Sequence, residues 1–106
     1  MIKRVVLVKT DRPARIDDEL ARLAGLRGTI PCLRDIEVAA DVGGRCLGYD
    51  RMFVLSFGDA EDIAAWSDHP AHAPLRTTLL RDAELLVFEY RTPAIISLFD
   101  TKHLSY

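Results

Sequence analysis

The sequence predicts a single α+β domain with the element order β-α-β-β-α-β. Its 106 residues lie well below the roughly 250–300 residues beyond which chains usually split into domains. Four short apolar runs have the composition of strands, and segments of helical period separate the first run from the second and the third from the fourth. Two successive strand–helix–strand units are typical of the ferredoxin-like fold, in which an antiparallel sheet packs against helices.

The first half of the chain contributes two strands and a helix. Residues 2–9 are a β-branched apolar run between charges, which favours a strand. From Pro13 the period changes, and we expect an amphipathic helix from there to between residues 25 and 28. Its apolar face comprises Ile16, Leu20, Leu23 and Ala24. Residues 33–42 alternate in part and predict the second strand, which is followed by a glycine-containing loop.

The second half begins with another strand and a short helix. Residues 49–57 are aromatic and β-branched, which is typical of a strand. Asp59 is suited to cap the following helix, because its carboxylate can accept hydrogen bonds from the free N–H groups of the first turn. Ile63 and Trp66 are expected on the buried side of that helix.

A further helix and a final strand complete the pattern. Because proline is favoured at the first helical position, Pro70 is expected to open a helix that ends near Asp82. Leu75 and Leu79 should face inward from it. Residues 85–90 are apolar and predict the fourth strand.

The first and last strands are apolar on both faces. Residues 5–8 and residues 85–88 lack the alternation of an antiparallel sheet with one solvated face. The predicted helices can cover only one face, and each buried Val or Leu contributes roughly 1.5–3 kcal/mol. We therefore predict a homodimer that forms through the sheet faces. The alternative is that loops or the carboxy-terminal tail cover the second face.

Composition and charge exclude several classes of protein. The net charge is −2, which does not suit a strongly basic nucleic-acid binder. No apolar run approaches the roughly 20 residues of a membrane span, and the amino terminus is too charged for a secretory signal. Two cysteines, Cys32 and Cys46, make no disulfide framework. We predict a cytoplasmic domain with reduced thiols that binds neither nucleic acid nor membrane.

One motif between the two helices of the second half is fairly specific for its position. It is His69-Pro70-Ala71-His72, in the segment that begins at Trp66. With Gly48-Tyr49 before the third strand and the closing Leu86-Val87-Phe88-Glu89-Tyr90, it resembles the stress-responsive dimeric A/B barrel (Dabb) domain family. The resemblance covers roughly residues 2–91, so we take residues 1–91 as the domain. Residues 92–106 would be a carboxy-terminal extension, forming an arm across the dimer or an extra edge strand.

The resemblance implies an assembly and, for some members, a reaction. Members of the family are homodimers in which two ferredoxin-like sheets form a barrel. Most have no assigned activity, while a few plant members are polyketide cyclases that close a linear poly-keto chain by aldol condensation without cofactor or metal. We accordingly expect no cofactor here. The sequence also lacks the Cys-x-x-Cys or carboxylate spacing of a zinc site, so we expect no metal.

His72 is the candidate catalytic residue. A neutral imidazole can remove a proton from a carbon beside a carbonyl, and in the cyclase-like members the second histidine of the motif is the catalytic base. The alternative is structural, because a histidine near a helix start often hydrogen-bonds to the backbone. His69 precedes proline, which favours extended geometry, and we interpret it as a structural residue that caps the next helix.

Trp66 stands where the cyclase-like members carry a tyrosine that orients the substrate. Its indole retains a ring and one N–H donor but lacks the hydroxyl acceptor. The interpretation we prefer is an aromatic core residue packed over the sheet.

Arg4 and Arg51 stand where the cyclase-like members carry histidines that line the pocket. Arginine cannot act as a base, but its guanidinium can bind a carboxylate or phosphate through two N–H groups. Our hypothesis is that Arg4, Arg51 and His72 form a cationic end to an otherwise apolar pocket that selects an anionic ligand. The alternative is that each arginine reaches water at a strand end or pairs with Asp50 or Glu89.

The sequence thus predicts a small-molecule site between sheet and helices. The residues expected in its apolar wall are Val6, Val8, Phe53, Trp66, Leu75 and Val87. One hypothesis is cofactor-free acid–base chemistry on an apolar or anionic carbonyl compound, and another is a non-catalytic binding or stress-related scaffold. A weaker third is cofactor-free oxygenation, as in the related dimeric barrels of antibiotic-biosynthesis monooxygenases.

Overall fold

The computed structural model describes residues 1–92 and confirms the predicted fold class. The elements are β1 (Ile2–Lys9), α1 (Pro13–Gly25), β2 (Asp35–Ala40), β3 (Arg51–Phe57), α2 (Ala60–Ser67), α3 (His72–Asp82) and β4 (Glu84–Arg91). All neighbouring strands are antiparallel, in the order β2-β3-β1-β4. This is the ferredoxin-like arrangement, with the second helical segment divided into α2 and α3.

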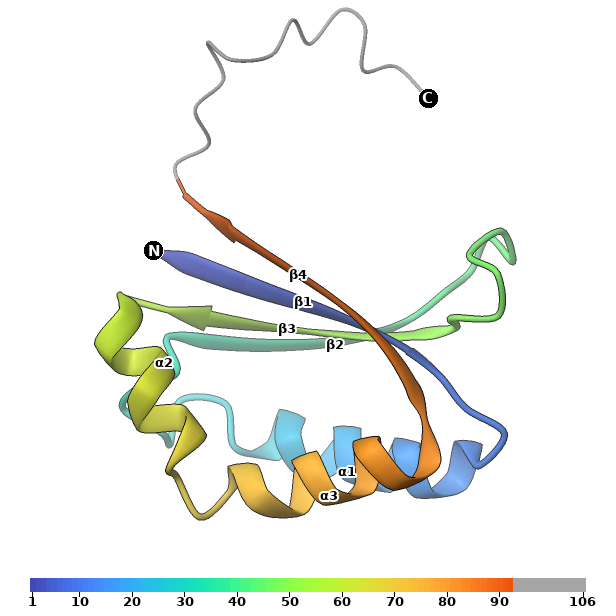
Figure 1. Ribbon diagram of the computed structural model, residues 1–106, viewed down its shortest axis with the longest axis horizontal. Helices are drawn as coiled ribbons and strands as arrows, with labels where there is room; N and C mark the ends of the chain where they lie inside the picture. The colour runs from blue at the N-terminus through green and yellow to red at the C-terminus, as the bar shows by residue number, and fades with distance from the viewer. Residues whose placement is uncertain (93–106) are drawn as a thin grey trace, which may run out of the picture.

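The helices cover one face of the sheet (Figure 1). α1 and α3 pack side by side beneath the strands, and α2 lies near one end of the sheet. The hydrophobic core fills the space between these layers, as alternation along the strands requires. The predicted inward residues of the two long helices are buried: Ile16, Leu20, Leu23, Leu75 and Leu79.

The start of α3 differs from the prediction. The helix begins at His72 rather than at Pro70, because the preceding residues form a turn. Within that turn the Ala71 N–H donates to Nδ1 of His69 and the His72 N–H donates to the His69 carbonyl, both at 3.0 Å. Arg22 of α1 donates to the Ala71 carbonyl, also at 3.0 Å, so α1 holds the turn in place. His69 is therefore a structural residue of the turn, but the prediction that it caps the helix is wrong, because it accepts from Ala71, which precedes the helix, and α3 has no side-chain cap. His72 becomes the first residue of α3.

Two strands are shorter than predicted, because the chain between them turns away from the sheet. β2 ends at Ala40, and the Asp41 carboxylate accepts hydrogen bonds from the N–H groups of Gly43 and Gly44 at 3.2 and 2.7 Å. The next strand begins only at Arg51. Asp59, by contrast, caps α2 as expected.

The second face of the sheet carries no helix among residues 1–92 (Figure 1). The middle of that face is nevertheless apolar on β1 and β4, where Val5 lies opposite Phe88 and Leu7 opposite Leu86. Phe88 is 66% exposed, and Leu86 and Tyr90 are exposed beside it. The predicted arm or edge strand falls, apart from Thr92, outside the described residues.

Candidate functional site

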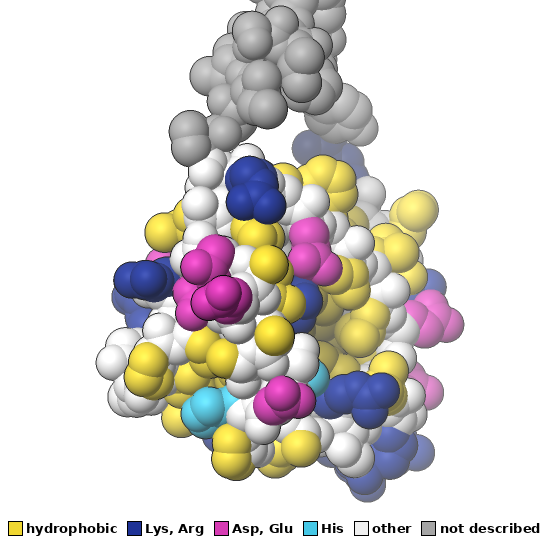
Figure 2. Space-filling model, turned by 60° about the vertical axis from the view of Figure 1, so that its left-hand side comes forward, with side chains coloured by type: hydrophobic (Ala, Val, Ile, Leu, Met, Phe, Trp, Pro, Cys, Tyr) yellow, Lys and Arg dark blue, Asp and Glu magenta, His cyan; other side chains and the backbone are white. Residues whose placement is uncertain are grey.

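A cavity of about 220 Å³ lies between the sheet and helices α2 and α3. The face shown in Figure 2 has a hollow with hydrophobic walls and with histidine and charged side chains close to it. The residues that line the cavity are Arg4, Val6, Phe53, Leu55, Trp66, His72, Leu75, Arg76, Leu79, Leu80, Leu85, Val87 and Glu89. Sites for drug-sized ligands usually measure roughly 300–1,000 Å³, so this cavity fits a smaller molecule.

The structure brings most of the predicted site residues together here. Those that line the cavity are Arg4, Val6, Phe53, Trp66, His72, Leu75 and Val87. Alternation explains the strand residues, because side chains two apart on β1 or β4 point to the same face. The turn before α3 explains His72, because it sets the helix start against Trp66 of α2.

Val8 and Arg51 do not line this cavity, so the predicted grouping of both arginines with His72 is wrong. Val8 lies opposite Arg51 in the β1–β3 register, whereas Arg4 lies opposite Leu55. The four residues from Arg4 to Val8 correspond to about 13 Å along the strand. The two arginines therefore occupy opposite ends of the same sheet face.

Arg51 is held by two carboxylates. It donates to Asp50 at 2.8 Å and, through Nε and Nη2, to both oxygens of Asp17 on α1, the Nη2 contact measuring 3.1 Å. These hydrogen bonds hold the pKa of Asp17 below its usual value and raise that of Arg51. Arg51 therefore pairs with Asp50, as the alternative interpretation of the sequence proposed. Through Asp17 it also links β3 to α1.

His72 combines a structural contact with a position in the cavity wall. Its Nδ1 lies 3.2 Å from the Ser67 carbonyl oxygen. Because a carbonyl oxygen can only accept, Nδ1 carries the proton and Nε2 is the basic nitrogen of the neutral ring. The imidazole packs at 5.1 Å from the Trp66 ring, tilted by 59°. In the neutral ring this contact favours the tautomer that a base at Nε2 requires.

Trp66 is fully buried, with 0% of its surface exposed. It packs against His72 on one side and stacks on His69 at 6.0 Å, which agrees with the interpretation as a core residue. Its indole N–H, however, has no hydrogen-bond partner among residues 1–92. A buried donor without an acceptor costs about 1–3 kcal/mol.

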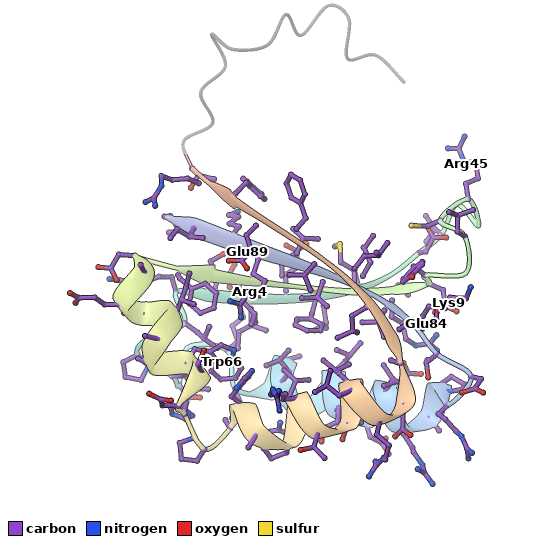
Figure 3. The ribbon with its side chains drawn as sticks, viewed as in Figure 1. Arg4, Lys9, Arg45, Trp66, Glu84 and Glu89 are labelled. Atoms are coloured by element: carbon purple, nitrogen blue, oxygen red, sulfur yellow. The ribbon has the colours of Figure 1, made fainter. Side chains whose placement is uncertain are left out.

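Arg4 reaches into the same space from β1. Its side chain and that of Glu89 on β4 point toward one another (Figure 3), as their opposite positions in the β1–β4 register require. The Nε–Oε1 distance is 3.5 Å, and Nε is buried without a hydrogen-bond partner in the described part of the chain. The guanidinium also lies 5.4 Å from the centre of the Phe57 ring. Arg4 thus retains a donor that the protein leaves unused.

Sequence analysis did not place two charged residues in the cavity, Arg76 and Glu89, although it named Glu89 as a possible partner of an arginine, which the contact with Arg4 bears out. Arg76 follows His72 by four positions, so one helical turn places both on the same face of α3. Glu89 follows Val87 by two positions on β4, and alternation places both on the helix side. Both periodicities were available in the sequence once His72 and Val87 had been chosen.

Residues 1–92 contain no cluster of three or more His, Cys, Asp or Glu side chains that could hold a metal ion. Cys32 is buried, and burial raises the pKa of its thiol. None of the three helices within this range is long and apolar enough to cross a membrane.

Comparison with known proteins places the chain in a family. The profile described as stress responsive A/B barrel domain matches residues 2–91. No curated protein sequence matches the chain.

Solved structures share the fold at low sequence identity. A dimeric ferredoxin-like protein of unknown function from Jannaschia sp. CCS1 is 21% identical, with a TM-score of 0.75 over 86% of this chain and 98% of that one. The Arabidopsis thaliana protein At3g17210 is 26% identical, with a TM-score of 0.73 over 90% and 98%. SnoaB, a cofactor-independent oxygenase from Streptomyces nogalater, is 14% identical, with a TM-score of 0.69 over 90% and 95%.

Proposed function

The chain belongs to the stress responsive A/B barrel domain family, and from that premise we propose that its cavity binds a small apolar compound carrying a carbonyl or anionic oxygen. The observation that carries the proposal is a pair of buried N–H donors without partners among residues 1–92, Nε of Arg4 and Nε1 of Trp66. Both residues line the cavity. Both atoms have almost no accessible surface, so a ligand oxygen would reach them through a small shift of the cavity wall, and accepting from them would recover the cost of their burial.

The charges of the cavity favour an anion. Arg4 and Arg76 line it with a single carboxylate, Glu89, so these three residues sum to one positive charge. An arginine in largely apolar surroundings attracts a carboxylate more strongly than an arginine in water does. The apolar wall would bind the body of the ligand and Arg4 its charged end.

His72 supplies the chemistry in this proposal. Its Nε2 would remove a proton from a carbon beside the ligand carbonyl, while Arg4 holds the charged end of the ligand in place. This is cofactor-free acid–base chemistry of the cyclase-like kind. Arg51 has no part in it, because it does not line the cavity and is paired with Asp17 and Asp50.

Binding can be measured through Trp66, the single tryptophan of the chain. We expect benzoate to change its fluorescence and Arg4→Leu to weaken that binding by about tenfold or more, which is about 1.4 kcal/mol. Arg51→Leu is the matched control, because it removes the same charge from the same sheet face outside the cavity. Equal affinity of the Arg4→Leu variant would contradict the anionic site.

Catalysis needs a separate test. In D₂O, 3-benzoylpropionate carries a carboxylate for Arg4 and exchangeable protons beside a ketone. We expect protein-dependent exchange at that carbon, followed by NMR, and a drop of about 100-fold or more in His72→Gln. Exchange that survives the substitution, with binding intact, would favour the non-catalytic scaffold.

Oxygenation is the second candidate. The fold likeness to SnoaB, which is described as a cofactor-independent oxygenase, favours testing it. An electron-rich phenol that binds in the cavity should then consume dissolved oxygen in a protein-dependent way without added cofactor. Binding without oxygen uptake would leave the acid–base hypothesis.

The homodimer belongs to the same proposal. The exposed apolar face of β1 and β4 and the dimeric state named for the Jannaschia relative support association through that face. Sedimentation should give twice the 11.9 kDa of the chain, and Phe88→Asp should give a monomer. Leu80→Asp is the control that should stay dimeric, because Leu80 is an exposed residue of α3 and lies outside that face. A monomeric parent protein at micromolar concentration would overturn the dimer.

A further inference from the structure

The cavity already contains one carboxylate of the protein. We propose that the Glu89 carboxylate pairs with Arg4 when the site is empty, and that a ligand binds to Arg4 by displacing Glu89. The inference rests on the proposed function, since it takes Arg4 as the group that binds the ligand. It goes further by naming Glu89 as the residue that decides which ligand charge the site selects.

The contact between Arg4 and Glu89 is loose. The Nε–Oε1 distance of 3.5 Å exceeds the roughly 2.7–2.9 Å of a charge-assisted hydrogen bond, and Nε has no hydrogen-bond partner among residues 1–92. Arg51 shows what a well-paired arginine looks like in this fold, since its Nε, Nη1 and Nη2 each donate to a carboxylate. A ligand carboxylate that contacts Arg4 through two N–H groups would therefore gain hydrogen bonds that Glu89 does not make.

Glu89 can leave without cost to the core. Its side chain is 43% exposed, against 20% for Arg4. It also lies on β4, which is an edge strand of the sheet. The displaced carboxylate would be hydrated at once, so no unpaired charge would be buried. Arg4 stays beside Phe57 and exchanges one anion for another.

This exchange predicts the ligand class. A neutral ligand can accept from Nε of Arg4 but does not displace Glu89, so its affinity should not depend on the charge of Glu89. A dianion suffers repulsion from the displaced carboxylate, which stays at the rim. The favoured ligand is a small apolar monocarboxylate, and Glu89 lowers its affinity by competing for Arg4.

The test compares Glu89→Gln with Glu84→Gln. Figure 3 shows Glu84 near Lys9, away from Arg4 and Glu89, and Glu84 does not line the cavity. Both substitutions remove one negative charge from β4, so a general charge effect is shared. At low salt we expect Glu89→Gln to bind benzoate about fivefold or more tightly than the parent protein, as loss of a competing, partly exposed ion pair predicts. Benzyl alcohol should bind both equally, and Glu84→Gln should match the parent protein.

The outcomes separate this inference from the proposed function. If Arg4→Leu loses benzoate but Glu89→Gln binds it no more tightly, Glu89 does not compete and only the inference fails. If Arg4→Leu binds benzoate normally, or no variant binds it at millimolar concentration, both fail. Phthalate gives a second readout, because its affinity should rise more than that of benzoate when Glu89 loses its charge.

Discussion

The helix-covered face of the sheet has an arginine at each end, and the two differ in how far the protein satisfies them. Arg51 donates to the carboxylates of Asp17 and Asp50. Arg4 has one loose contact with Glu89 and a buried Nε without a partner in the described residues. The sequence made them look equivalent, since both are arginines on apolar strands. The difference shows that the neighbouring elements decide whether an arginine ties the fold together or is left available.

The elements that face each arginine explain this difference. At the Arg51 end, α1 brings Asp17 under the sheet and the strand start brings Asp50. At the Arg4 end, α2 and α3 bring Trp66 and His72, neither of which is acidic. Among the described residues that line the cavity, the one carboxylate is Glu89, from the neighbouring strand. The cavity lined by His72 and Trp66 lies at the end where the helices offer Arg4 no carboxylate.

The largest effect we predict is at the Arg4 end. Trp66→Ala should destabilise the protein by about 3–5 kcal/mol, because it removes a fully buried aromatic side chain and leaves a void. Trp66→Phe should lose much less, because a ring still fills the site. Denaturant unfolding followed by circular dichroism measures both. A loss under 1 kcal/mol in the alanine variant, of the order seen for surface sites, would mean that Trp66 is not part of the core.

An intermediate effect separates the two arginines directly. Arg51→Met should destabilise the protein by about 1 kcal/mol, because it leaves Asp17 and Asp50 without their partner. Arg4→Met should be neutral or slightly stabilising, because it removes a buried donor without a partner and leaves Glu89, which is 43% exposed, to be hydrated. The same unfolding experiment compares them. If Arg4→Met were the more destabilising variant, Arg4 would be a structural residue, and the contrast between the two arginines would be wrong.

The smallest effect concerns pH. Arg51 lowers the pKa of Asp17 through a hydrogen bond, so the folded protein binds fewer protons there than the unfolded chain. The resulting stabilisation is present above the unfolded pKa of about 3.9 and is lost as the pH falls through the folded pKa. Because Asp17 is 55% exposed, we expect about 0.5 kcal/mol.

NMR titration of the Asp17 carboxyl checks the cause of that shift. In Arg51→Met its pKa should rise toward the ordinary value. The pKa of Asp82, which Arg81 lowers, should stay unchanged and serves as the internal control. An Asp17 pKa that does not respond would mean that Arg51 is not its partner in solution.

Much of the fold was predictable because each signal is local. The periods of β1 and α1, the cap at Asp59 and the apolar β4 depend on residues near one another in the chain, and the structure agrees with them. The start of α3 was not predictable in the same way. It depends on the His69 turn and on Arg22, which is 49 residues away from Ala71 in sequence.

The sequence by itself determined the order of the elements, the apolar second face and the residue types available to a site: a histidine at a helix start, a tryptophan and arginines on strands. Only the tertiary structure decided which of these meet. Alternation placed both arginines on one face, but it carries no information about which carboxylate from another element lies opposite each. The packing of α1 against the sheet brings Asp17 into hydrogen-bond contact with Arg51. The packing of α2 and α3 left Arg4 beside a cavity with Glu89 as its sole carboxylate among the lining residues, because that choice depends on contacts between segments distant in the chain.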